Sequence, residues 1–101
     1  MLAILSVFPM GKGSSLSKYV AEAVEEIEKS GLDYRLTAMG TVIEGEWEPV
    51  MKLLKKIRDR LLKVSDRVYM TVAIDEKKDR RRRIEEKVKS VEAALGRSLK
   101  K

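Results

Sequence analysis

Side chains that could bind a small organic ligand gather in one stretch, residues 37–47, which has the sequence TAMGTVIEGEW. Its carboxylates Glu44 and Glu46 flank a glycine and precede Trp47, the only tryptophan of the chain. A carboxylate beside an aromatic ring suits an organic cation or an aminopyrimidine, because charge pairing and cation–π attraction can act together. We interpret this stretch as one wall of a small-molecule pocket, placed where a strand leads into a helix.

A purely structural interpretation of the same residues stays open. Gly45 could simply turn the backbone, Glu46 could complement a helix dipole, and Trp47 could belong to the core.

Hydroxyl groups offer further ligand contacts, since one falls on each strand that we predict: Ser6, Thr37, Thr41 and Thr71. If several line one cleft, they would orient a polar heterocycle, although threonine is common in strands in any case.

Two basic segments could bind anions. Residues 11–15 (GKGSS) precede an expected helix N-terminus, which attracts anions, but they do not match the P-loop pattern, and an ordinary capped loop is the favoured interpretation. Residues 77–83 (KKDRRRR) place four arginines in an expected first helical turn, where they oppose the helix dipole. A solvated or subunit-paired face is the favoured interpretation of this run. RNA binding is the alternative, and the lack of aromatic residues for base stacking weighs against it.

The net charge of +6 comes entirely from the last quarter of the chain. Residues 1–75 hold 11 basic and 11 acidic side chains, whereas residues 76–101 hold 11 basic and 5 acidic ones. The chain has no cysteine and no histidine, which excludes thiolate metal sites and the commonest general base. We therefore expect no enzyme, no cofactor and no metal. Asparagine and glutamine are also missing, a pattern typical of hyperthermophilic proteins.

Hydrophobic periodicity predicts the order β-α-β-β-α-β followed by one more helix. The strands are expected at residues 2–8, 33–37, 41–44 and 67–75. The first helix should be capped by Ser15 or Ser17 and end at Gly31. The second should run from Glu46 or Glu48 to about Val64, and the third from Asp79 to Gly96. This order is typical of the ferredoxin-like α+β sandwich, here with an additional C-terminal helix, in a single domain over residues 1–101. No apolar run is long enough to span a membrane, so we expect a cytoplasmic protein.

One face of such a sheet would remain uncovered by the two sandwich helices. That face would carry Tyr69, Ala73 and alternate residues of the first strand. We expect this first strand to be buried on both of its faces. Large apolar patches usually mark interfaces. The sequence therefore predicts a homo-oligomer in which sheets or C-terminal helices pack across subunits.

Three segments together resemble the small thiamine-binding protein family. The first is residues 6–20, SVFPMGKGSSLSKYV, and the second, which is the most specific, is residues 39–47, MGTVIEGEW. The third leads from Asp79, Arg80 and Arg81 to residues 86–91, EKVKSV. The resemblance covers nearly the whole chain.

This resemblance implies a ferredoxin-like fold, assembly into dimers and tetramers, and binding of thiamine or its pyrimidine moiety without catalysis. Thiamine has a cationic thiazolium ring and an aminopyrimidine ring, which need a carboxylate, an aromatic face and hydroxyl groups. By position, the ligand contacts that we expect are Ser6, Thr37, Met39, Gly40, Thr41, Glu44 and Trp47. We therefore expect a non-catalytic carrier or sensor. RNA binding through residues 77–83 and a structural assembly protein without ligand are the alternatives.

Overall fold

A computed structural model of the chain describes residues 1–13, 16–78 and 83–100, without the side chain of Arg83. The elements in chain order are β1 (Leu2–Pro9), α1 (Ser17–Ser30), β2 (Asp33–Thr37), β3 (Gly40–Glu44), α2 (Trp47–Leu61), β4 (Val68–Asp75) and α3 (Arg83–Leu95). The four strands form one antiparallel sheet in the order β2-β3-β1-β4. The predicted ferredoxin-like α+β fold with an additional C-terminal helix is confirmed.

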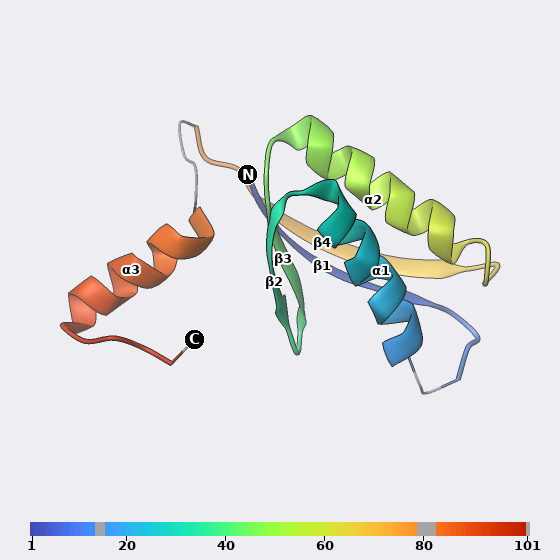
Figure 1. Ribbon diagram of the computed structural model, residues 1–101, viewed down its shortest axis with the longest axis horizontal. Coiled ribbons are helices and arrows are strands. Elements are labelled where there is room, and N and C mark those ends of the chain that lie inside the picture. The colour runs from blue at the N-terminus through green and yellow to red at the C-terminus, as the bar shows by residue number, and fades with distance from the viewer. Residues whose placement is uncertain (14–15, 79–82, 101) are drawn as a thin grey trace.

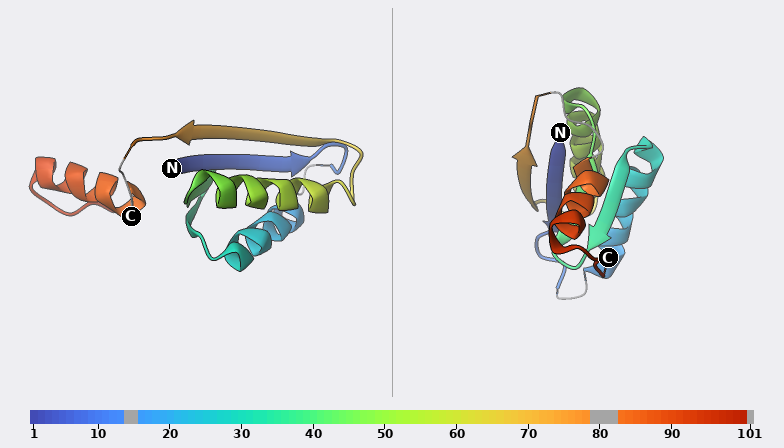
Figure 2. Two further views of the ribbon diagram at one scale, coloured as in Figure 1. Left: turned by 90° about the horizontal axis from the view of Figure 1, so that it is seen from above. Right: turned by 90° about the vertical axis from the view of Figure 1, so that its left-hand side faces the viewer.

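Both sandwich helices cover the same face of the sheet, and α3 lies beyond its end (Figures 1 and 2). The strand register places Ala3 beside Ile43 and Ile74 on the helix-covered face. Because side chains alternate along a strand, the residues between them point to the open face. The core between sheet and helices consists of Met1, Ala3, Leu5, Ala23, Ile27, Ile43, Val50, Leu53, Ile57 and Leu61.

The prediction that the first strand is buried on both faces is wrong for the single chain. Ile4 is 38% exposed and Ser6 is exposed, whereas their neighbour Leu5 is buried. The reason is that no helix or strand of the described part of the chain covers the open face at these positions. Near its beginning, by contrast, the strand is enclosed, and Leu2 is buried.

The helix ends agree with the sequence patterns in part. Gly31 ends α1 in the left-handed conformation, as predicted, but Leu16 occupies the N-cap and no side chain caps the start. Ser15 and Asp79, two of the predicted caps, lie outside the described residues. Helix α2 ends three residues earlier than predicted, because the chain beyond Leu61 tightens into turns with hydrogen bonds over three residues. Among the described helices, none is long and apolar enough to cross a membrane.

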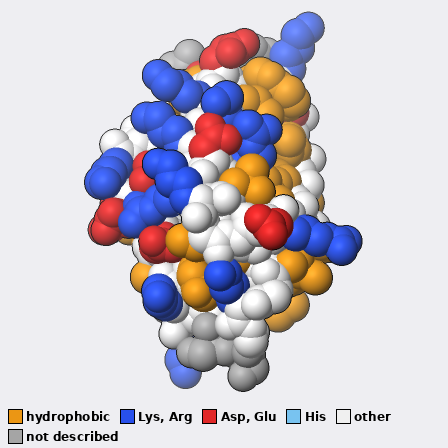
Figure 3. All heavy atoms as spheres, turned by 90° about the vertical axis from the view of Figure 1, so that its right-hand side faces the viewer, with side chains coloured by type: hydrophobic (Ala, Val, Ile, Leu, Met, Phe, Trp, Pro, Cys, Tyr) orange, Lys and Arg blue, Asp and Glu red, His pale blue; other side chains and the backbone are white. Residues whose placement is uncertain are grey.

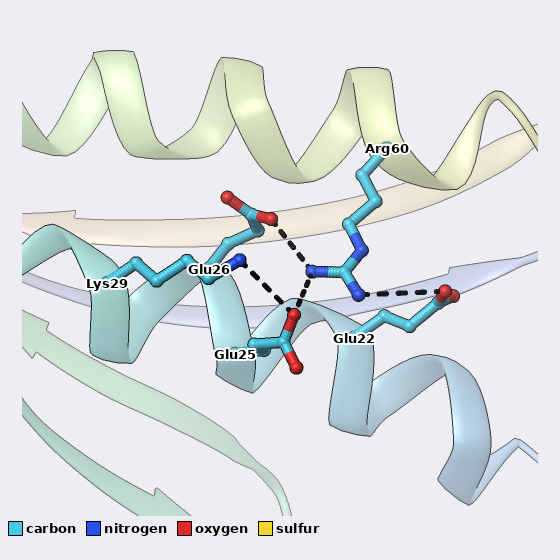
Figure 4. A network of polar contacts seen from close by, with 5 residues as sticks. All are labelled: Glu22, Glu25, Glu26, Lys29 and Arg60. Atoms are coloured by element: carbon cyan, nitrogen blue, oxygen red, sulfur yellow. Dashed lines mark hydrogen bonds and ion pairs between the residues drawn. The ribbon is translucent and has the colours of Figure 1, made fainter.

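A cluster of ion pairs joins the two sandwich helices on their outer side (Figure 4). Arg60 of α2 donates hydrogen bonds to Glu25 (2.9 Å) and Glu26 (2.8 Å) of α1, and Glu22 lies 3.8 Å from the same guanidinium group. Lys29 adds a 3.3 Å contact to Glu25. The Arg60 hydrogen bond, supported by Lys29, lowers the pKa of the Glu25 carboxyl below its ordinary value. One arginine thus ties α1 to α2 through several carboxylates.

This pKa shift predicts a pH-dependent difference between the wild type and an Arg60→Met variant. A carboxyl whose pKa is lowered in the folded protein contributes stability that is fully present above its unfolded pKa, near 4.5, and is lost as the pH falls through the folded pKa. The gap in free energy of unfolding should therefore stay constant at neutral pH and shrink below about pH 4.5. Urea denaturation across this range measures it.

The matched control is Lys63→Met, because Lys63 lies near the same cluster and forms no ion pair with any described residue. Its stability difference from the wild type should not follow the same acid-dependent course. A gap between wild type and Arg60→Met that is independent of pH would contradict the role given to Glu25.

Candidate functional site

A small pocket lies between α1 and the hairpin formed by β2 and β3. Strand β1 runs beside β4 as far as Pro9, but its pairing with β3 stops where Leu5 meets Thr41. Beyond that pair the hairpin leaves β1, and a cavity of about 160 Å³ remains under α1. Its lining consists of Leu5, Ser6, Val7, Val20, Ala23, Val24, Ile27, Leu36, Thr37, Ala38, Met39, Gly40 and Thr41.

Five of the seven expected ligand contacts line this pocket, namely Ser6, Thr37, Met39, Gly40 and Thr41. Glu44 and Trp47 do not. Glu44 is three residues beyond Thr41 on the same strand, and an odd separation places its side chain on the opposite face of the sheet. Trp47 is the first residue of α2 and is 51% exposed. Within one chain, the carboxylate and the indole are therefore separated from the hydroxyl group of Thr41. The side chain of Ser6 alternates with that of Leu5 and so points, like that of Glu44, to the open face of the sheet.

The three hydroxyl-bearing residues at the pocket differ in their hydrogen bonds and in their exposure to solvent. Thr37 donates a hydrogen bond to the carbonyl oxygen of Gly40 (2.7 Å) and accepts one from the amide of Met39 (3.2 Å), so it holds the hairpin turn. Ser6 is exposed to solvent. Thr41 is only 5% exposed as a residue and lines the pocket. Of the three hydroxyl groups, that of Thr37 is thus the one already engaged in the hairpin turn.

Gly40 fits the close approach of the hairpin to β1. Its φ is +150°, and a Cβ atom at this position would lie 2.8 Å from the backbone oxygen of Leu5. A side chain would therefore push β3 away from β1 at the edge of the pocket. The presence of glycine at position 40, within the segment 39–47 that resembles the family, therefore has a direct steric reason.

Glu44 instead lies at the start of α3. The amide of Ile84 donates a hydrogen bond of 3.2 Å to Glu44 Oε1, and a carboxylate is favourable at a helix N-terminus because of the helix dipole. Lys87 adds an ion pair of 3.2 Å with Asp75 of β4. These contacts connect α3 to the end of the sheet.

We predict that Glu44→Ala loosens the first turn of α3. A hydrogen bond to a charged group contributes roughly 1.5–3 kcal/mol, so amide hydrogen exchange at Ile84 should accelerate about tenfold or more, as measured by NMR. Glu46→Ala is the matched control, since Glu46 is exposed and forms no capping hydrogen bond. Unchanged exchange at Ile84 in Glu44→Ala would show that this contact does not hold the helix.

The residues of α1 that line the pocket were not among the expected ligand contacts. Val20, Ala23 and Val24 follow helical spacing, which indicates a core face and gives no sign of a cavity. A larger and more open groove of about 820 Å³ lies between α1 and α2, among charged side chains such as Lys52 and Lys56. It contains none of the expected ligand residues. Among the described residues, no cluster of acidic side chains could hold a metal ion.

The basic run at residues 77–83 is described at Lys77 and Lys78 and in the backbone of Arg83. Residues 79–82 lie outside the described residues, and the side chain of Arg83 is not described. The described neighbours Lys77 and Lys78 are exposed. The alternative of RNA binding through this segment therefore stays a prediction from the sequence.

The sheet topology and the pocket beneath the hairpin define a ferredoxin-like α+β protein with a cavity the size of a single ring. Residues 3–92 match the family described as thiamine-binding protein, and the chain belongs to this family. The UPF0045 protein MJ1052 of Methanocaldococcus jannaschii is 41% identical over 91 residues, which cover 90% of this chain and 91% of the relative. A UPF0045 protein of Methanothermobacter thermautotrophicus is 42% identical over 96 residues, which cover 92% and 97% of the two chains.

Solved structures show the same fold. The crystal structure of MJ1052 aligns with a TM-score of 0.83 at 41% identity and covers 89% of this chain and 93% of that protein. A protein of Thermotoga maritima, TM0486, named as a candidate thiamine biosynthesis/salvage protein, aligns with a TM-score of 0.79 at 28% identity. That alignment covers 89% of this chain and 96% of the other. The description of the family and the name of TM0486 both refer to thiamine.

Proposed function

We propose that the protein binds thiamine or a related aminopyrimidine without catalysis, as a carrier or sensor, in a homo-oligomer. The observation that carries this proposal is the pocket under the hairpin, in which five of the expected contact residues meet. A ligand ring in this cavity would touch Leu5 and Ile27 and could exchange hydrogen bonds with Thr41. Membership of the thiamine-binding protein family supports thiamine as the first ligand to test.

The uncovered face of the sheet supports the homo-oligomer. Phe8 and Tyr69 stack on this face with ring centroids 5.6 Å apart, and Tyr69 remains 52% exposed. Hydrophobic side chains gather along the edge opposite the charged helix layer (Figure 3). Helix α3 adds Val91 and Leu95, each 50% exposed. Because exposed apolar surface of this kind favours association, a second subunit would cover it.

The experiment is a calorimetric titration with thiamine after unfolding and refolding, which removes any co-purified ligand. Binding at micromolar or lower concentration corresponds to at least about 8 kcal/mol and would support the proposal. Sedimentation of the same sample tests the homo-oligomer. A folded protein that gives no heat with thiamine and none with the free hydroxymethyl-aminopyrimidine would refute ligand binding of this class.

A further inference from the structure

Two loops that are far apart in sequence meet at the end of the molecule opposite α3 (Figure 1). One loop follows β1 and contains Gly11 and Lys12, and the other connects α2 to β4 over residues 62–67. Between them lies an open hollow of about 510 Å³. Figure 3 looks onto this end of the molecule, where Lys and Arg side chains lie at several places. The hollow is separate from the pocket under the hairpin, because the two have no lining residue in common.

Hydrogen bonds tie the two loops together. The amide of Met10 donates to the carbonyl oxygen of Arg67 (2.7 Å). The hydroxyl of Ser65 lies within hydrogen-bonding distance of the carbonyl oxygens of Met10 (2.8 Å) and Arg67 (2.9 Å), and it accepts a hydrogen bond from the Arg67 amide (3.2 Å). These contacts use backbone atoms and the Ser65 hydroxyl, so they leave the guanidinium group of Arg67 available. A ligand that binds here does not have to order the loops first.

The charged side chains of the hollow are three cations and one carboxylate, namely Lys12, Lys63, Arg67 and Asp66. None of them forms an ion pair with a described residue. By contrast, Arg60 on α2 is already paired with carboxylates of α1. Three cations against one carboxylate leave an excess of two positive charges at the hollow. Because like charges held near one another repel, a bound dianion would stabilise this arrangement.

A phosphate group is the anion that fits this excess of charge. Near neutral pH, a phosphate monoester carries close to two negative charges. A guanidinium group can bind two phosphate oxygens at once, and an ammonium group adds a compact positive charge. The backbone beside Lys12 leaves room for such a group, since nothing lies within 4 Å of the place that a Cβ atom of Gly11 would occupy.

We propose that the hollow between these two loops is a binding site for a phosphate-type dianion, held by Lys12, Lys63 and Arg67. The dianion is either inorganic phosphate or the phosphate group of a larger molecule. This site gives the basic residue of the segment 11–15 a role that the sequence pattern alone does not show, because its cationic partners come from the other loop. The inference does not depend on the proposed function.

The test is a titration with sodium phosphate and, separately, with phenyl phosphate, followed by amide NMR near neutral pH. Sodium chloride keeps the ionic strength constant. We expect the amide signals of residues 10–12 and 62–67 to shift and saturate, with a dissociation constant of about 1 mM or lower. Saturation with inorganic phosphate would identify the free ion as a sufficient ligand, and saturation with phenyl phosphate alone would assign the site to a phosphate carried by an organic molecule. Shifts that do not saturate with either anion would overturn the proposal.

Variants in the α2–β4 loop distinguish a binding site from a general positive field. Arg67→Met removes the guanidinium group and should weaken binding about tenfold or more, whereas Arg67→Lys keeps the charge and should recover part of the affinity. Asp66→Asn removes the carboxylate and should strengthen binding by roughly two- to fivefold.

Lys52→Met is the matched control for Arg67→Met, because it lowers the net charge equally at an exposed lysine in the groove between α1 and α2. Its affinity for phosphate should equal that of the wild type. Equal weakening in Arg67→Met and Lys52→Met, or unchanged affinity in a folded Arg67→Met, would overturn the site. Thiamine binding by Arg67→Met should match that of the wild type, so a failure of this proposal is distinguishable from a failure of the proposed function.

Discussion

Thiamine should bind about a hundredfold more weakly to an Ala23→Leu variant than to the wild type, a loss of roughly 2.7 kcal/mol. Ala23 is buried in α1 and lines the pocket. Leucine adds three carbon atoms, which would occupy a substantial part of the 160 Å³ cavity and leave too little room for a ring. The measurement is calorimetric titration with thiamine.

The same substitution should not lower the stability, because filling an existing cavity avoids the strain that overpacking causes in a dense core. Ala21→Leu is the matched control, since Ala21 lies on the same helix and is exposed. Urea denaturation of both variants shows whether the fold is intact. Undiminished thiamine binding by a folded Ala23→Leu would place the ligand somewhere other than this pocket.

Ile57→Ala should lower the free energy of unfolding by roughly 2–5 kcal/mol, the usual cost of removing a fully buried aliphatic side chain. Ile57 lies in the middle of α2 with no exposed surface, within the core between helices and sheet. Its loss leaves a cavity where α2 meets the sheet. Urea denaturation of wild type and variant measures the difference.

Ile74→Ala is the control for this core substitution, since it removes the same atoms from a side chain that is 41% exposed. Its cost should be clearly smaller, because less apolar surface leaves water at this position on folding. Equal losses in the two variants would mean that Ile74 is also buried in the assembled protein, which sedimentation at several concentrations would detect. An Ile57→Ala variant as stable as the wild type would contradict the core described above.

Periodicity was sufficient to predict the fold. Tyr69 and Ala73 were expected on the uncovered face of the sheet, and their register beside Phe8 and Ile4 of β1 places them there. The same holds for the helices, whose apolar stripes give the buried residues Ile27 and Ile57. Such patterns work because a strand and a helix each repeat their buried side at a fixed interval.

The geometry of the candidate site was less accessible to sequence patterns. Glu44 and Trp47 are close in sequence to Thr41, but strand alternation and the start of α2 direct them elsewhere. Val20 and Ala23 line the cavity from a segment that is distant in sequence. A hydrophobic pattern identifies the side of a helix that faces the sheet. It does not reveal how completely that side is filled, which depends on where the hairpin departs from β1.

The two walls of the pocket are anchored very differently. On its outer side, α1 is held to α2 by the Arg60 ion pairs, and Ile27 anchors the helix in the core. The hairpin tip depends on Thr37 and its turn hydrogen bonds, and Met39 there lies almost entirely in solvent. We therefore expect a ligand that enters the cavity to displace the hairpin tip sooner than the helix. In that case the rates of ligand uptake and release would depend on the five-residue tip, residues 36–40, rather than on the sandwich.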